Sequence, residues 1–225
     1  MKEAQEAADA VTEVPDDVPT ERAVLAGLVE TGINALWDAP PRWGDRVGVV
    51  GAGMVGLTVA LLLRRFPLAR LEVADCDASR AEVASAVGLR FVTPDAAAGD
   101  CDLVFHASAS EGGLAGALDL LGVEGELVEL SWYGDRAPHV PLGLGFHARR
   151  LTIRASQVGR VAPARAARRT ACDRLALALD ALRDDAFDRL LAPAVPFADL
   201  PSVMEALDAG DGTPYCQVIT YPEEP

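Results

Sequence analysis

The segment from Arg46 to Asp75 constrains the fold of this chain more than any other. Its sequence, RVGVVGAGMVGLTVALLLRRFPLARLEVAD, reads as a strand, a glycine turn, a helix and a second strand that ends at an acid. The apolar run Val47–Val50 predicts the first strand, and Met54 to Phe66 predicts the helix. Pro67 ends this helix because proline has no N–H to continue it. Leu71–Ala74 is the expected second strand.

Three glycines in this segment follow the spacing G-x-G-x-x-G. Gly51 permits a tight turn, Gly53 leaves room for a pyrophosphate, and Gly56 lets the helix lie close to the sheet. The helix begins at Met54 and Val55, where free N–H groups and the positive end of the helix dipole favour a phosphate. The spacing therefore predicts a dinucleotide-binding turn. The alternative is a doubly wound domain that keeps the turn only for packing.

Asp75 lies at the end of the second predicted strand, about 20 residues beyond the glycines, where such folds hold the ribose. A carboxylate there accepts hydrogen bonds from both ribose hydroxyls of NAD and repels the 2′-phosphate of NADP. The residue that follows is Cys76, so no arginine is adjacent to receive that phosphate. We therefore expect NAD as the cofactor in preference to NADP.

Length and composition indicate one domain, or one domain with a small appendage, because the chain has 225 residues and half are hydrophobic. No charge-free apolar stretch of about 20 residues is present, so we expect no membrane span. The acidic first 17 residues lack the apolar centre of a signal peptide. The four cysteines, Cys76, Cys101, Cys172 and Cys216, form no C-x-x-C pair. This pattern favours reduced cysteines in a cytoplasmic protein.

The formal net charge of −14 predicts a surface that repels nucleic acid and anionic membranes. One segment departs from this: no Asp or Glu occurs between Arg136 and Cys172. Its arginines are Arg136, Arg149, Arg150, Arg154, Arg160, Arg165, Arg168 and Arg169. Two interpretations stay open, a solvated helix face with a dimer rim, or a local attraction for an anionic cofactor or substrate.

Alternating strand and helix patterns continue after Asp75. Further strands are expected at Leu89–Val92, Leu103–His106, Glu126–Leu130, Leu151–Ala155 and Tyr215–Thr220. Helices are expected at Arg22–Trp37, Ala78–Val87, Gly112–Leu121, Ala164–Arg183, Ala186–Leu191 and Pro201–Ala209.

These elements predict an α/β fold, a doubly wound parallel six-stranded sheet of the Rossmann type with a C-terminal appendage of helices and a strand. We expect a tail or linker over residues 1–20, an NAD(P)-binding domain over 21–160, and C-terminal helices with a closing strand over 161–225. Ligands of such sheets bind at the carboxyl ends of the strands. This places Ala107–Ser108, Ser131 and Ser156–Gln157 near the glycine turn.

A family resemblance is carried by several segments together. They are VPTERAVLAGLVETGINALWDA at Val18–Ala39, GDRVGVVGAGMVG at 44–56, D-x-D-x-x-R at Asp75, Asp77 and Arg80, A-x-x-x-G at Ala84–Gly88, and the tail LAPAVPFADLPSVMEALDAGDGTPYCQVITYP. In these the chain resembles the medium-chain dehydrogenase/reductase superfamily, the relatives of zinc-type alcohol dehydrogenase.

The resemblance implies NAD(P)-dependent oxidation of an alcohol, or the reverse reduction, on a small-molecule substrate. By position it implies that Asp75 and Arg80 contact the adenosine ribose. It also implies a set of residues facing the nicotinamide: Thr31, Ala107, Ser108, Ser131, Ser156 and Gln157. For the hydroxyl groups among them, a hydrogen bond to local backbone is the open alternative. The superfamily commonly dimerises through the edge of the sixth strand, here Leu151–Ala155, so a homodimer is expected.

The chain also departs from the superfamily. Most of the N-terminal catalytic domain is missing, with its G-H-E motif, its catalytic cysteine and its four-cysteine zinc loop. A further zinc ligand should fall near Gly27, which cannot ligate, and Glu30 is three residues away. The three histidines lack ligand spacing: His106, on a strand, reads as a satisfied core residue, His147 as an ordinary polar loop residue. We therefore predict no metal site and expect no zinc in this chain.

Three functions are consistent with these observations. The first is a truncated NAD(H)-dependent oxidoreductase of the alcohol dehydrogenase type. The second is a non-catalytic dinucleotide-binding module, or the cofactor-binding half of a split enzyme. The third, a degraded copy that binds no cofactor, is disfavoured by the intact glycines and Asp75. Hydride transfer needs a group that polarises the carbonyl, and only Tyr133 and Ser131 are candidates, so the catalytic residues stay unassigned.

Overall fold

A computed structural model describes residues 11–209 and 215–221. Six parallel strands form one sheet in the order β3-β2-β1-β4-β5-β6. Their bounds are β1 (Arg46–Val50), β2 (Arg70–Ala74), β3 (Arg90–Val92), β4 (Cys101–His106), β5 (Leu121–Glu129) and β6 (Thr152–Ala155). This is the strand order of a Rossmann fold, which confirms the predicted fold class. The order reverses between β1 and β4, where such sheets open a crevice for ligands.

Each strand of the sheet centre sends alternate side chains to opposite faces, and both faces are covered. Val47 and Val49 of β1 pack with Phe105 of β4 in one apolar cluster. Val50 and Val104 lie in the second cluster, on the opposite face. Burial on both faces explains why these strands read as continuous apolar runs.

Helices cover both faces of this sheet. α3 (Ala26–Asp38), α4 (Met54–Leu63), α5 (Ala81–Ala86) and α9 (Ala171–Ala181) contribute to the first cluster, and α6 (Glu111–Leu120) and α7 (Gly145–Ala148) to the second. α4 is buried from Gly56 to Leu63, so it is apolar on every side. This central helix carries the end of the glycine turn.

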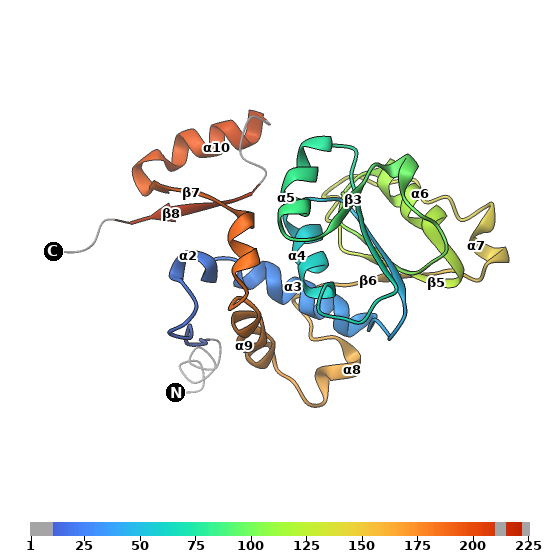
Figure 1. Cartoon of the computed structure of the whole chain (residues 1–225), viewed down its shortest axis with the longest axis horizontal. Helices are drawn as coiled ribbons and strands as arrows, with labels where there is room; N and C mark the ends of the chain where they lie inside the picture. Colours follow the sequence, from blue (N-terminus) through green and yellow to red (C-terminus); the bar gives the residue numbers. More distant parts are fainter. Residues whose placement is uncertain (1–10, 210–214, 222–225) are drawn as a thin grey trace.

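The remaining elements complete the chain. They are α2 (Thr20–Ala23), η1 (Ala78–Arg80), η2 (Pro94–Ala96), α8 (Pro163–Ala166), η3 (Asp185–Leu190), β7 (Leu191–Pro196), η4 (Phe197–Asp199), α10 (Leu200–Ala209) and β8 (Cys216–Thr220). β7 and β8 pair in a separate two-stranded parallel sheet. Figure 1 shows this small sheet with α10 to one side of the large sheet, as the predicted C-terminal appendage. The predicted domain boundaries themselves stay predictions.

Two helices predicted in the last third of the chain differ in the structure. The helix expected over Ala164–Arg183 is two helices, because Thr170 starts α9 with a capping box. The Thr170 side chain accepts a hydrogen bond from the Asp173 N–H, and Asp173 accepts one from the Thr170 N–H. The helix expected over Ala186–Leu191 is the 3-10 turn η3, and Leu191 already belongs to β7.

The helix expected over Arg22–Trp37 is also divided, into α2 and α3. Leu25 lies between them as the N-cap of α3 and is fully buried. The apolar spacing continues through this junction, so periodicity alone did not reveal the break. α3, which carries Thr31, packs against both α4 and α9.

Candidate functional site

The glycine turn lies between β1 and α4, and its three glycines meet different surroundings. Gly51 has a φ of +106°, and a Cβ there would lie 2.8 Å from the carbonyl carbon of Ala107. A Cβ on Gly56 would lie 1.8 Å from the Gly51 carbonyl oxygen. A Cβ on Gly53 would meet nothing within 4 Å. Packing therefore requires glycine at two positions, and at Gly53 the backbone faces open space.

Gly53 is the N-cap of α4, and among the described residues no side chain caps this helix. The N–H groups of Met54 and Val55 thus begin the helix beside the open space at Gly53. An uncapped helix start offers backbone donors and a positive dipole end to an anion. This is the arrangement that the sequence predicts for a pyrophosphate.

Asp75 lies at the end of β2 and is held against the glycine turn. Its Oδ2 accepts a hydrogen bond from the Ala52 N–H at 2.6 Å, and its Oδ1 accepts one from the Asp77 N–H at 2.9 Å. Each carboxylate oxygen has a second acceptor position. The two backbone bonds therefore orient the carboxylate and leave it able to accept hydroxyl donors.

Arg80 follows on η1, near the same edge of the sheet. Its Nε donates to Asp77 Oδ2 at 3.1 Å. Its Nη1 is buried and has no hydrogen-bond partner among the described residues. Asp77 in turn accepts bonds from the N–H and the hydroxyl of Ser79. The Arg80 guanidinium is thus fixed through its Nε, and its Nη1 still has hydrogen-bond donors for a ligand.

A pocket of about 470 Å³ lies at this edge of the sheet. It is lined by Val50, Gly51, Ala74, Asp75, Cys76, Pro94, Ala97, Ser108, Ser110, Gly112, Gly113, Gly116, Asp119 and Leu120. It brings together three of the predicted site residues, Gly51, Asp75 and Ser108. The wall formed by the start of α6 was not predicted, although its sequence, SEGGLAG, offers small residues that leave such space.

The predicted loops after β4 and β5 meet in a polar network. His106 is fully buried, as predicted for a satisfied core histidine, and both ring nitrogens have partners. Its Nδ1 lies 2.9 and 2.8 Å from the two carboxylate oxygens of Glu129, and its Nε2 lies 2.7 Å from Ser108 Oγ. The Ala109 N–H donates to Ser131 Oγ at 3.1 Å, which joins the two loops.

Two ionisable groups in this network have shifted pKa values. Burial acts to raise the pKa of Glu129, but hydrogen bonds from His106 and from the Ser131 N–H hold it below its ordinary value. Burial and the nearby Glu129 carboxylate raise the pKa of Tyr133. Glu129 is therefore ionised near neutral pH, while the Tyr133 phenol keeps its proton. Sequence reasoning did not select Glu129, whose only signal was an acid near the end of a predicted strand.

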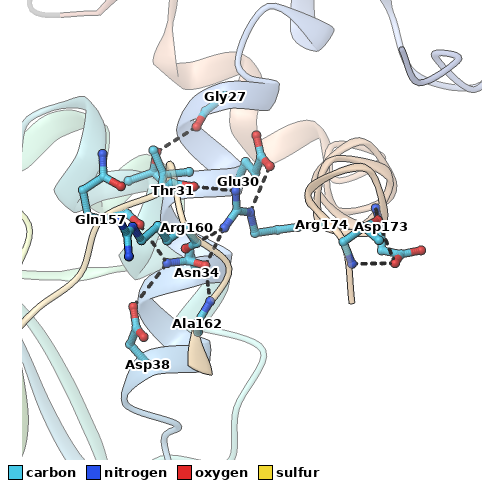
Figure 2. A network of polar contacts seen from close by, with 12 residues as sticks. Gly27, Glu30, Thr31, Asn34, Asp38, Gln157, Arg160, Ala162, Asp173 and Arg174 are labelled. Carbon is cyan, nitrogen blue, oxygen red and sulfur yellow. Dashed lines mark hydrogen bonds and ion pairs between the residues drawn. The ribbon is translucent and has the colours of Figure 1, made fainter. Parts of the chain in front are cut away.

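Thr31, Ser156 and Gln157 lie around α3, and the Ser156 N–H donates to the Glu129 backbone carbonyl at 3.0 Å, which joins this group to the network. Thr31 Oγ1 donates to the Gly27 carbonyl at 2.9 Å, which is the local backbone bond stated above as the alternative (Figure 2). Ser156 Oγ donates to Asp38 Oδ2 at 2.7 Å. The Gln157 carbonyl accepts from Asn34 Nδ2 at 3.5 Å. The structure thus packs the loop after β6 against α3, next to Thr31.

A buried arginine from α9 completes this second network. Arg174 is 3% exposed, and Figure 2 shows it reaching across to α3. Its Nε lies 2.9 Å from Glu30 Oε1, and its Nη1 donates to Asn34 Oδ1 at 2.5 Å. Its Nη2 donates to the Val158 carbonyl at 2.5 Å. Glu30, the carboxylate nearest to the superfamily's ligand position, is therefore engaged in an ion pair.

Metal-ligating side chains do not gather in the part of the chain that the structure describes, where no group of three or more His, Cys, Asp or Glu is placed to hold an ion. His139 and His147 are both exposed. His147 lies on α7 and not in a loop as predicted. No helix within residues 11–209 or 215–221 has the length and apolar character needed to cross a membrane.

The arginine-rich segment divides into two groups. In the first group, Arg136 donates to the Ala109 carbonyl at 3.1 Å and Arg149 to the Leu121 carbonyl at 2.5 Å. Arg150 pairs with Glu124 at 3.0 Å, and Arg154 pairs with Glu126. These arginines serve contacts within the domain. The others, Arg160, Arg165, Arg168 and Arg169, have exposed side chains around α8. The interpretation as a solvated face thus fits the second group, and the attraction for an anionic ligand stays a prediction.

The sheet order and the glycine turn define a domain of the Rossmann class. No protein-family model matches the chain. A sorbitol dehydrogenase from Bos taurus is 35% identical over 79 residues, which are 35% of this chain and 22% of that protein. A sorbitol dehydrogenase from Ovis aries has the same identity and coverage. The match therefore spans about a fifth of these curated relatives.

Solved structures resemble the chain over most of its length. A zinc dependent alcohol dehydrogenase from Streptococcus pneumoniae has a TM-score of 0.76 at 17% identity, covering 95% of this chain and 62% of that chain. 2R,3R-butanediol dehydrogenase from Bacillus subtilis has a TM-score of 0.74 at 18% identity, covering 95% of this chain and 60% of that chain. An Escherichia coli alcohol dehydrogenase solved with NADH has a TM-score of 0.73 at 18% identity, covering 92% of this chain and 61% of that chain. At these identities the likeness shows a shared fold, over about three fifths of each protein.

The two kinds of relatives agree on one superfamily. The curated matches are sorbitol dehydrogenases, and the structural neighbours include zinc-dependent alcohol dehydrogenases. These findings confirm the resemblance to the medium-chain dehydrogenase/reductase superfamily that the sequence motifs predict. The resemblance covers only part of the length of those proteins.

Proposed function

We propose that this chain binds NAD(H) and serves hydride transfer between the nicotinamide and an alcohol or carbonyl substrate. The observation that carries the proposal is the open space at Gly53 together with Asp75 at the neighbouring pocket. The pyrophosphate is expected over the N–H groups of Met54 and Val55. The adenosine ribose is expected at Asp75, in the pocket of about 470 Å³.

The preference for NAD over NADP rests on charge. The Asp75 carboxylate is oriented by the N–H groups of Ala52 and Asp77, and it presents negative charge to the ribose. A 2′-phosphate would be repelled there. Arg80 has a spare donor on Nη1, and we expect it to bind the adenosine side of the cofactor.

The oxidoreductase activity is supported by the kind of relatives that the chain matches. Sorbitol dehydrogenases match in sequence, and one structural neighbour was solved with NADH. The protein must supply a polarising group and exclude water for hydride transfer. Tyr133 keeps its proton near the loops after β4 and β5, and it stays the candidate donor. Ser131 lies in the same network, and we assign no further catalytic residue.

A second candidate function is a dinucleotide-binding module without catalysis, or the cofactor-binding half of a split enzyme. The observation that favours it is the Glu30–Arg174 ion pair at 2.9 Å. Glu30 is the carboxylate nearest to the position of a zinc ligand in the superfamily, and this pair engages it in packing. In that case the chain binds the cofactor, but by itself it does not oxidise an alcohol.

The test is a titration of the full chain with NADH and with NADPH, followed by energy transfer from its tryptophans to the reduced nicotinamide. We expect tighter binding of NADH. Asp75→Ala should weaken NADH binding about tenfold, which is about 1.4 kcal/mol, and narrow the preference over NADPH. Formation of NADH from NAD with a panel of polyols and alcohols then separates the enzyme from the binding module.

Glu82→Ala is the matched control, because it removes the same charge from an exposed position on α5. It should leave both affinities unchanged. If the ratio of NADH to NADPH affinity is the same in Asp75→Ala as in the unaltered chain, Asp75 does not contact the ribose. If neither cofactor binds the unaltered chain, the proposal is wrong.

A further inference from the structure

The end of β4 carries an arrangement that cofactor binding does not require. A carboxylate, an imidazole and a hydroxyl follow one another in line, from Glu129 through His106 to Ser108. The distances are 2.8 Å from Glu129 Oε2 to His106 Nδ1 and 2.7 Å from His106 Nε2 to Ser108 Oγ. The three residues come from the carboxyl ends of two neighbouring strands, where His106 and Glu129 are register partners.

The proton positions in this line follow from its acceptors. Glu129 is ionised and also accepts the Ser131 N–H at 2.8 Å, so its oxygens can only accept. The proton of a neutral imidazole therefore lies on Nδ1 of His106, between the ring and Glu129. The lone pair on Nε2 then accepts the hydrogen of the Ser108 hydroxyl. This is the protonation state in which an imidazole acts as a general base toward a serine.

Ser108 is also accessible. His106 is fully buried, whereas Ser108 is half-buried and lines the pocket of about 470 Å³. Gly113 leaves the room for its hydroxyl, since a Cβ there would lie 2.1 Å from Ser108 Oγ. Much of the remaining wall is apolar, with Val50 and Leu120 among its residues. The base is thus shielded from water, and the hydroxyl faces a pocket suited to a small apolar group.

We propose that Ser108 is a nucleophile, activated by His106 as general base and by Glu129 as positioning residue, toward carboxylic esters with a small apolar acyl group. The hydrolysis needs no dinucleotide, so the proposal goes beyond the proposed function.

The reaction is balanced without an oxidant or a reductant. Ser108 Oγ bonds to the ester carbonyl carbon, and its proton moves to His106 Nε2. The bond from that carbon to the alkoxy oxygen breaks, and the proton on Nε2 passes to the departing alkoxide, which leaves as an alcohol. Water then attacks the acyl-serine through the same base, and the carboxylic acid is released as Ser108 recovers its proton.

The proposed ester site and the proposed cofactor site share one pocket. Gly51 and Asp75 line it with Ser108. A dinucleotide bound there should therefore slow acylation of Ser108. Competition between dinucleotide and ester therefore tests whether the two sites overlap. NADH titration measures the cofactor site directly, and acylation of Ser108 measures the ester site directly.

The first experiment mixes the full chain with p-nitrophenyl acetate and follows the release of p-nitrophenol. We expect a burst, and an acetyl group on the peptide that contains Ser108 by mass spectrometry. Ser108→Ala should lower the rate roughly a hundredfold or more, and His106→Gln should do the same because an amide takes up no proton. Ser85→Ala, an exposed serine on α5, is the matched control and should keep the full rate.

The second experiment uses the unaltered chain, so it does not depend on the folding of a variant. A fluorophosphonate probe is added with and without NADH, and the adduct is located by peptide mapping. An adduct on Ser108 supports the proposal. No adduct, an adduct confined to other residues, or equal ester hydrolysis by Ser108→Ala overturns it. Acylation of Ser108 in a chain that binds no NADH would leave this proposal intact and refute the proposed function.

Discussion

At the scale of single residues, the three turn glycines divide into two physical classes. Gly51 and Gly56 are required by close backbone approaches, since a Cβ at either would collide with backbone atoms. Gly53 has an extended backbone, with φ −79° and ψ −173°, that any residue adopts. The fold therefore does not require glycine at position 53, and the missing side chain leaves the space in front of this backbone open.

This division predicts opposite effects of two substitutions. Gly53→Val should leave the melting temperature within a few degrees of that of the unaltered chain and abolish measurable NADH binding, because the side chain fills the pyrophosphate position. Gly56→Ala should destabilise the fold by at least about 1–3 kcal/mol, since even a methyl group collides with the Gly51 carbonyl. Thermal unfolding and NADH titration of both variants provide the test. Unchanged NADH affinity in Gly53→Val would remove the pyrophosphate from this position.

At the scale of elements, α9 is joined to α3 by a buried charge. Arg174 is 3% exposed and has ion-pair or hydrogen-bond partners on α3 and in the loop after β6. A buried arginine is stable only when its donors are satisfied. The network therefore sets how α9 and the loop sit against α3, which carries Thr31.

Removing this arginine should be costly. We expect Arg174→Ala to lower the free energy of unfolding by about 3–5 kcal/mol, because Glu30 would be left as an uncompensated, mostly buried charge. Arg168→Ala removes the same charge from an exposed position and should change stability by less than about 0.5 kcal/mol. Urea unfolding of the two variants gives the comparison. Equal stabilities would show that the network contributes nothing to the packing of α9.

At the scale of the whole molecule, the large sheet has an exposed edge at β6. All four residues of this strand, Thr152–Ala155, are exposed, and Ile153 is 36% exposed. An open strand edge offers backbone groups to a partner strand. This exposed edge supports the prediction of a homodimer that forms through β6.

The dimer prediction is tested by sedimentation of the purified chain. The unaltered chain should sediment as a dimer, and Ile153→Lys should shift it toward the monomer, because a charge on the edge opposes pairing. Val24→Lys replaces another exposed apolar residue, remote in sequence at the junction of α2 and α3, and should leave the dimer intact. A monomeric unaltered chain, or a dimer insensitive to Ile153→Lys, would refute this interface.

The sequence by itself determined the features that local pattern carries. The strand, glycine turn, helix and second strand from Arg46 to Asp75 were predicted because apolar runs, glycine spacing and proline act over neighbouring residues. The boundary errors fall where local signals compete. The long apolar spacing through Arg22–Trp37 hid the break at Leu25, and the capping box of Thr170 was present in the sequence but not recognised.

Only the tertiary structure decided which distant polar groups meet. His106 and Glu129 are 23 residues apart, and the register of β4 against β5 makes them partners. Glu30 and Arg174 are 144 residues apart, and the packing of α9 on α3 joins them. Buried polar groups need partners, but sequence does not say which partner is near, because strand register and helix packing are properties of the whole fold.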